Sequence, residues 1–137
     1  MKSYEYFEAT ADVGLRAYGN DMNEAFENAG KAIFNIISDT SLIEPVREIE
    51  FEVASEDDVS LLYDYLEELL FFHEVEFMLF SEFHVEIDEN FHLKAKIRGE
   101  AIDWQKHERK CEIKAITFHK MHVKKDACVE VQAIVDL

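Results

Sequence analysis

The spacing of apolar residues changes along this chain of 137 residues without a regular alternation of strand and helix. In two segments the apolar residues recur at helical spacing, and in the other apolar runs they alternate with a period of two. The period-two runs fall near residues 4–6, 13–17, 46–53, 83–97, 111–123 and 128–135. Strands that follow one another without an intervening helix pair in antiparallel fashion. The pattern therefore predicts an α+β fold: one compact domain over residues 1–137, with antiparallel β-sheets packed against two long helices and an extended β-hairpin.

The two helical segments have distinct start signals. Asp21 is followed three residues later by Glu24, a capping-box spacing that predicts a helix from Met22 to Ile37. The second helix is predicted to follow the acidic run that ends at Asp58 and to continue to about Leu79. It is apolar around much of its circumference, so we expect it to lie at the centre of the domain.

The charge balance limits the partners of the chain. Thirty acidic and 14 basic side chains give a formal net charge of −16. Such a chain is repelled by nucleic-acid phosphates and by anionic membranes, so we expect no direct nucleic-acid binding and no membrane binding. Cations or basic protein surfaces are the expected partners, and a role in solubility alone is the open alternative.

The sequence contains no signal of export or of a membrane span. Its N-terminal segment lacks an apolar core, and no apolar run approaches the roughly 18–20 residues of a spanning helix. Cys111 and Cys128 are far apart and form no CxxC motif, which is typical of reduced, structural thiols. These features predict a cytoplasmic protein.

Common catalytic motifs are also absent. The sequence has no G-x-G-x-x-G, P-loop, G-x-S-x-G or H-E-x-x-H pattern, and its four glycines are scattered. No histidine is paired in sequence with a cysteine, so we do not predict an enzyme. His107 and His119 remain candidates for polar members of a site.

Two acidic residues stand out by position. Asp12 precedes Val13-Gly14 in the expected turn between the first two strands, and Asp136 is the penultimate residue of the sequence. A carboxylate beside the terminal carboxylate of Leu137 would offer the oxygen ligands that Ca²⁺, Mg²⁺ and Mn²⁺ prefer. A turn-forming role for Asp12 and a frayed, solvated terminus at Asp136 are the simpler alternatives.

A third group mixes acid, base and hydroxyl side chains between Gly99 and His119. It includes Glu100, Asp103 and His107, and then the segment EIKAITFH at 112–119. Lys114 in this segment protects a strand edge against aggregation or, alternatively, presents a cation to a phosphate.

Several segments together resemble the archease family over essentially the whole chain. They are TADVGL at 10–15, AYG at 17–19, EAF at 24–26, LLF at 69–71, GE at 99–100, EIKAITFH at 112–119 and VQAIVDL at 131–137. The resemblance implies a compact α+β domain that acts as a non-enzymatic activator of the RtcB-type tRNA-splicing ligase. It implies that the protein promotes guanylylation of the ligase with GTP and multiple turnover in the joining of tRNA exon halves.

The resemblance also implies a metal site and a contact surface. The family's metal ligands correspond to Asp12 and Asp136, with Leu137 supplying its carboxylate or backbone oxygen. Calcium is the expected ion, as a stand-in for Mg²⁺ or Mn²⁺ in the cell. Glu112, Lys114 and His119 are the candidate ligase contacts, and we expect a monomer or a weak homo-oligomer.

Two departures from the family pattern and two alternatives remain. Leu137 stands where the family more often has isoleucine, which is a mild change because the proposed ligand is main chain. Ala9 occupies the position at which the family usually has a histidine, which puts the affinity of the metal site in question. A chaperone or RNA-modification accessory without a metal role is the main alternative, with the charged hairpin of residues 81–98 as a client-binding arm. A small metal-dependent hydrolase is a third hypothesis, but it lacks a recognisable nucleophile.

Overall fold

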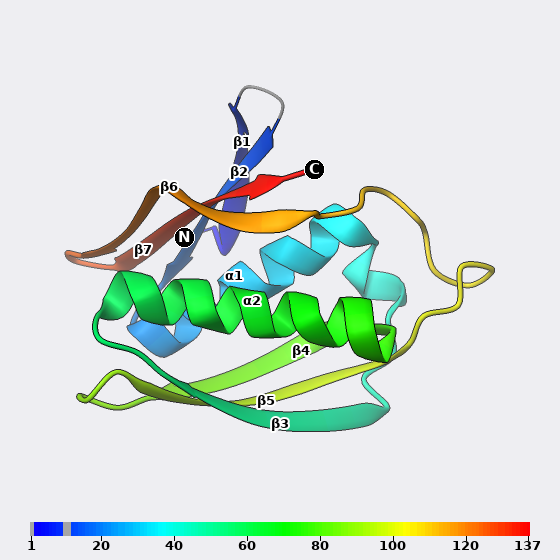
Figure 1. Ribbon diagram of the computed structural model, residues 1–137, viewed down its shortest axis with the longest axis horizontal. Coiled ribbons are helices and arrows are strands. Elements are labelled where there is room, and N and C mark those ends of the chain that lie inside the picture. The colour runs from blue at the N-terminus through cyan, green and yellow to red at the C-terminus, as the bar shows by residue number, and fades with distance from the viewer. Residues whose placement is uncertain (1, 10–11) are drawn as a thin grey trace.

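The computed structural model describes residues 2–9 and 12–137 (Figure 1). Thr10 and Ala11, which belong to the first segment of the family resemblance, lie outside the described residues. The elements are β1 (Tyr4–Ala9), β2 (Asp12–Gly19), α1 (Met22–Ile37), a 3₁₀ turn (Thr40–Leu42), β3 (Arg47–Ala54), α2 (Asp58–Glu76), β4 (Met78–Ile87), β5 (His92–Ala101), β6 (Ala115–Lys125) and β7 (Val129–Asp136).

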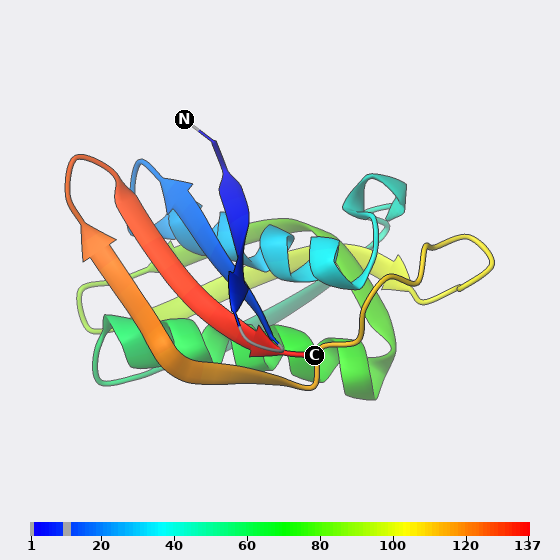
Figure 2. The same ribbon diagram turned by 90° about the horizontal axis from the view of Figure 1, so that it is seen from above.

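Two antiparallel sheets enclose the two helices. One sheet has the strand order β1-β2-β7-β6 and the other β3-β5-β4. Helix α1 packs against β2, β4 and β7, whereas α2 packs against β6 and the three-stranded sheet. Figure 1 shows the helices as a middle layer between the sheets, and Figure 2, seen from above, shows the four-stranded sheet lying across them. The predicted α+β class, with two long helices and antiparallel sheets in one compact domain, is confirmed.

Helix α1 begins and ends where the sequence predicts. The Asp21 side chain accepts a hydrogen bond from the Glu24 backbone N–H at 2.8 Å. The Glu24 carboxylate in turn accepts from the Asn20 N–H at 2.9 Å. These contacts satisfy backbone donors that the first helical turn leaves free. The inward face of the helix, including Phe26, Ile33 and Phe34, is fully buried.

Helix α2 ends three residues earlier than predicted. Phe77 adopts a left-handed backbone conformation with φ 55°, which stops the helix, and Met78 begins β4. Met78, Leu79 and Phe80 are fully buried. Short apolar runs suit a buried helix and a buried strand equally well, so periodicity could not locate this boundary. Within the described residues, no helix is long and apolar enough to cross a membrane.

The β4–β5 hairpin is part of the core and does not extend from the domain as a free arm. Strand β5 is the central strand of its sheet, and Val85, Leu93 and Ile97 are buried. The opposite face is charged and exposed, as predicted. Its cross-strand ion pairs from β3 to β5 are Glu52–Lys94 at 3.8 Å, Glu50–Lys96 at 3.7 Å and Glu48–Arg98 at 3.0 Å.

The segment before β6 is a loop and not a strand. The sequence predicts a strand from Cys111, but β6 begins at Ala115, and exposed residues alternate with buried Ile113 in the loop before it. A single alternating segment is not enough to form a strand when no neighbour pairs with it. Both cysteines are free thiols, Cys111 exposed and Cys128 half-buried.

Candidate functional site

Asp12 and Asp136 lie directly opposite each other at one end of the four-stranded sheet. Strands β2 and β7 are antiparallel with Asp12 in register with Asp136. Residues opposed in this way carry their side chains on the same face, with Cβ atoms about 5 Å apart. The neighbouring Val135 is fully buried, so the two aspartates project from the outer face of the sheet. Residues 124 positions apart in sequence thus present two carboxylates together.

Both aspartates belong to strands, so the frayed, solvated terminus considered for Asp136 is wrong. Asp12 is the first residue of β2, where the sequence predicts a turn. Asp136 is the last residue of β7, and its carbonyl accepts a hydrogen bond from the Lys114 backbone N–H at 2.7 Å. This bond and the β2 ladder hold the end of the chain in place. Leu137, which follows, is half-buried and packs against the core.

The position of the family histidine lies beside this pair. Ala9 is in register with Asp12 on β1, and Ala115 is in register with Asp136 on β6. The four residues form a row across all four strands, with two alanines flanking two aspartates. Ala9 and Asp12 line the same groove, so an imidazole at position 9 would project from the same face as the carboxylates.

The donor set at this end of the sheet suits a hard divalent cation. Two opposed carboxylates provide up to four oxygens, and a backbone oxygen of Leu137 would add another, against the six to eight that Ca²⁺ takes. Within residues 2–9 and 12–137, no group of three or more His, Cys, Asp or Glu side chains could hold a metal. A cation here would therefore keep water ligands or take oxygens from a partner, an open arrangement typical of Mg²⁺ and Mn²⁺ sites as well.

A polar groove of about 750 Å³ extends from Asp12 along the same face. Arg16, His119, Lys120 and Gln132 line it. Strand β6 is irregular here, because its pairing with β7 shifts between Thr117 and His122. Lys120, at this irregularity, has a left-handed backbone with φ 54°. Such bulges redirect side chains, and this one turns His119 and Lys120 toward the groove.

The buried amide of Gln132 holds this bulge in place. Its oxygen accepts a hydrogen bond from Arg16 Nε at 2.8 Å, and its nitrogen donates to the Lys120 carbonyl at 2.8 Å. The Arg16 guanidinium also stacks on the Phe7 ring at 4.4 Å. Neither Arg16 nor Gln132 was predicted from the sequence as part of a site. A single glutamine within the apolar run of β7 was the available signal, since a buried amide needs partners.

The three candidate contact residues do not share one pocket. His119 lines the groove beside Asp12. Lys114 is exposed, and its backbone N–H donates a hydrogen bond to the Asp136 carbonyl. Glu112 lines a second groove of about 670 Å³, together with Phe77 and Trp104. The three residues were predicted from one continuous segment to form one contact surface. Glu112, which precedes Lys114 in the sequence, and His119, which follows it, belong instead to two different grooves.

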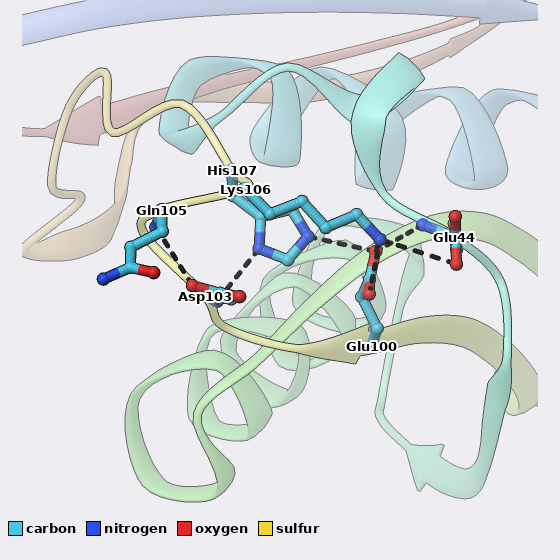
Figure 3. A network of polar contacts seen from close by, with 6 residues as sticks. All are labelled: Glu44, Glu100, Asp103, Gln105, Lys106 and His107. Carbon is cyan, nitrogen blue, oxygen red and sulfur yellow. Dashed lines mark hydrogen bonds and ion pairs between the residues drawn. The ribbon is translucent and has the colours of Figure 1, made fainter.

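The polar cluster around Glu100 is a separate network (Figure 3). Lys106 Nζ donates to both Glu100 carboxylate oxygens at 2.9 and 2.8 Å, and the Glu44 backbone N–H donates at 2.7 Å. His107 Nδ1 accepts from the Asp103 backbone N–H at 3.0 Å, which leaves Nε2–H to donate to Glu100 at 3.0 Å.

This network fastens the loop between β5 and β6. Partial burial alone would raise the pKa of Glu100, but hydrogen bonds from Lys106, the Glu44 N–H and His107 lower it to about 2. The His107 side chain is completely buried and has both ring nitrogens engaged. It is therefore a structural residue and not a member of the Asp12 groove, although sequence analysis left that role open.

The fold is that of a small α+β protein in which two antiparallel sheets enclose two helices, and comparison with known proteins identifies the family. The profile described as "Archease protein family (MTH1598/TM1083)" matches residues 4–137. The chain belongs to the archease family.

Similar proteins match all or most of its length. It is 50% identical to the archease of Methanothermobacter thermautotrophicus over 141 residues, covering 100% of both chains. It is 48% identical to the archease of Sulfurisphaera tokodaii over 124 residues, covering 90% of this chain and 89% of the relative. The solution structure of Methanobacterium thermoautotrophicum protein 1598 superimposes with a TM-score of 0.88 at 49% identity, covering 100% of both chains.

Proposed function

We propose that this protein is a non-enzymatic activator of the RtcB-type tRNA-splicing ligase in the cytoplasm. In this role it promotes guanylylation of the ligase with GTP and so allows multiple turnover in tRNA exon ligation. Membership of the archease family supports the proposal. The observation that carries it is the opposition of Asp12 and Asp136 on the outer face of the sheet, beside the exposed Lys114.

In this proposal Asp12, Asp136 and Leu137 hold one divalent cation, Ca²⁺ or in the cell Mg²⁺ or Mn²⁺. When bound, the ion would neutralise charge on phosphate oxygens during phosphoryl transfer. The ladder of β2 and β7 fixes the two carboxylates before the ion arrives, which reduces the entropy lost on binding. The Lys114 N–H, by bonding the Asp136 carbonyl, orients the residue that supplies one of them.

The charge of the chain suits a ligase that must have a basic cleft for RNA. A net charge of −16 favours docking beside such a cleft through electrostatic steering, without contact between this protein and RNA. We expect the association rate to fall by at least tenfold between 50 and 500 mM salt. An association rate that does not depend on salt would contradict this part of the proposal.

The test is multiple-turnover ligation of tRNA halves by the cognate ligase at limiting concentration, with GTP. The parent chain should raise the number of turnovers, Asp136→Ala should not, and Asp126→Ala should act like the parent. Asp126 is exposed in the turn between β6 and β7, at the opposite end of β7 from Asp136. Its replacement by alanine removes the same charge as Asp136→Ala does.

If the parent chain fails to raise turnover, the proposed function is wrong. Suppression of aggregation of an unrelated client would then favour the chaperone alternative. No feature of the hairpin supports that alternative, because its apolar face is already buried against the helices. If Asp136→Ala raises turnover as much as the parent chain does, the activator function stands, but the metal site is not required for it.

A further inference from the structure

The groove that begins at Asp12 has an apolar floor. The tip of the Phe7 ring lies against strand β2, because a Cβ atom at Gly14 would be 2.1–2.5 Å from three of its carbons. The ring can approach the backbone this closely only because residue 14 is glycine. Buried Ile134, in register with Gly14 on β7, continues the floor. The floor gives a ligand no hydrogen bonds, so the polar side chains around it decide what the groove binds.

The Arg16 guanidinium is fixed in this groove and still has free hydrogen-bond donors. Its Nε donates to Gln132 Oε1 at 2.8 Å, and its plane stacks on the Phe7 ring at 4.4 Å. Its Nη1 is 3.7 Å from a Glu5 carboxylate oxygen, which is too long for a hydrogen bond. Nη2 donates no hydrogen bond to any residue that the structure describes. A planar guanidinium with oriented, free N–H groups is well suited to bind phosphate oxygens.

Lys120 and His119 bring two more basic side chains to the same groove. Both are exposed, and within residues 2–9 and 12–137 no ion pair joins either of them to a carboxylate. Unpaired basic side chains are unexpected beside one another in a chain of net charge −16, in which carboxylates are plentiful. Lys120 also keeps a left-handed backbone with φ 54°, which glycine would adopt at lower cost. The position therefore favours the lysine side chain over the backbone conformation.

One buried side chain positions both Arg16 and Lys120. Gln132 is 6% exposed, and its amide bonds the Arg16 Nε on one side and the Lys120 carbonyl on the other. A buried amide costs stability unless it is hydrogen-bonded, and both bonds of this one go to residues that line the groove. A strained backbone and a buried polar group that serve the same two cations indicate a site for an anion.

The sign of the charge changes along the groove. Asp12 lies at one end with Asp136 opposite it, and Arg16, Lys120 and His119 line the remainder. The one other carboxylate among the described lining residues is Glu8, which is exposed. Asp12 and Arg16 are four residues apart on β2, a backbone separation of about 13 Å, and stacking on Phe7 directs the guanidinium along the sheet toward Asp12. A ligand that contacts a cation at the aspartates and the basic side chains together must carry several negative charges in a row, as linked phosphates do.

We propose that this groove binds the polyphosphate of a nucleoside triphosphate, between the divalent cation of the Asp12–Asp136 site and the side chains of Arg16, Lys120 and His119. This inference rests on the proposed function, in which the nucleotide is the GTP that guanylylates the ligase. In that step a bond forms between the ligase histidine nitrogen and the α-phosphorus. The bond from the α-phosphorus to the bridging oxygen breaks, and its electron pair leaves with pyrophosphate. The groove holds the β- and γ-phosphates, which GTP and pyrophosphate share.

The decisive variant is Lys120→Gly, because it separates stability from binding. It should leave the melting temperature unchanged or higher, since glycine suits the left-handed conformation and the backbone carbonyl that Gln132 bonds is kept. It should weaken pyrophosphate binding about tenfold, through the loss of one charge next to phosphate oxygens. Lys120→Gln should weaken binding to the same extent. Lys124→Gln is the matched control, because it removes the same charge from exposed Lys124, on the same strand and outside the groove.

The assay is calorimetric titration of the full chain, without ligase, in excess Mn²⁺. Pyrophosphate, GTP and GMP are the three probes. Pyrophosphate and GTP should bind with similar affinity, and GMP at least tenfold more weakly, because it lacks the β- and γ-phosphates. Replacement of Mn²⁺ by EDTA, or of Asp136 by alanine, should weaken pyrophosphate binding, since the aspartate end of the groove then repels the ligand.

The outcomes distinguish this inference from the proposed function. If the parent raises ligation turnover but binds neither pyrophosphate nor GTP, the polyphosphate site is wrong and the proposed function stands. If GMP binds as tightly as GTP, or if both Lys120 variants bind pyrophosphate as the parent does, the inference is also overturned. Binding of pyrophosphate that depends on Lys120, in a protein that does not raise turnover, would support the site and refute the activator function.

Discussion

Replacement of Asp136 by asparagine should make the metal-free protein more stable while it weakens metal binding. The side chain keeps its size and loses its charge, and Asp12 lies directly opposite in the β2–β7 ladder. Like charges opposed across two strands destabilise the sheet. If the loss of this charge stabilises the metal-free protein, the Asp12–Asp136 pair serves to bind a ligand and does not stabilise the fold.

The size of both effects follows from the register. Two unit charges about 5 Å apart repel by about 0.8 kcal/mol in a water-like dielectric. For a chain of this length this corresponds to a rise in melting temperature of about 3 °C. A carboxylate at about 2.4 Å from a divalent ion contributes about 3.5 kcal/mol in the same limit, so the variant should lose two to three orders of magnitude in Ca²⁺ affinity.

The assay is thermal unfolding in EDTA and in Ca²⁺ or Mn²⁺ at 100 times the dissociation constant of the parent. Saturation to that degree adds about 2.7 kcal/mol to the unfolding free energy of the parent, and the variant should show almost none of it. Asp126→Asn is the control and should respond to metal as the parent does. An Asp136→Asn protein that is less stable in EDTA, or that is stabilised equally by metal, would refute the reasoning.

Further predictions concern the row beside the site and the β5–β6 loop. Ala9→His should raise affinity for Mn²⁺ about tenfold relative to Ca²⁺ in calorimetry, because imidazole on the face of Asp12 suits the softer ion; an unchanged ratio of the two affinities would place position 9 outside the site. The lowered pKa of Glu100 should stabilise the fold above pH 4.5, with this contribution lost as pH falls from 4.5 toward 2. Glu100→Gln should reduce the unfolding free energy at pH 7 by about 1–2 kcal/mol and flatten its dependence between pH 2 and 4.5 in urea titrations. A slope in that interval equal to that of the parent would mean that Glu100 is not its source.

The elements with strong local signals were predictable, and the boundaries decided by tertiary contacts were not. The bounds of α1 follow from its capping box and its periodic apolar face. The end of α2 depends on Phe77, whose left-handed conformation has no sequence signal because glycine or asparagine is expected there. The start of β6 depends on whether β7 provides a partner, which no local pattern records.

The candidate site was also predictable only where its residues carry a local sequence signal. In the sequence, Asp12 stands out in an expected turn and Asp136 at the end of an apolar strand, and the family resemblance assigns both to one metal site. Their register is a property of strand pairing across almost the entire sequence. The bulge at Lys120 could not be predicted, because it depends on the contacts of Gln132 with Arg16 and with the Lys120 carbonyl.

The bulge has a consequence for how copies of this protein behave toward one another. Strand β6 is 11 residues long and lies at the edge of its sheet, and a regular edge of that length could pair with a strand of another molecule. The left-handed Lys120 interrupts it and leaves two shorter stretches with a charged residue between them. The same deformation that turns His119 toward the groove therefore also protects the sheet against edge-to-edge aggregation, so a change that regularised β6 would affect both recognition and solubility.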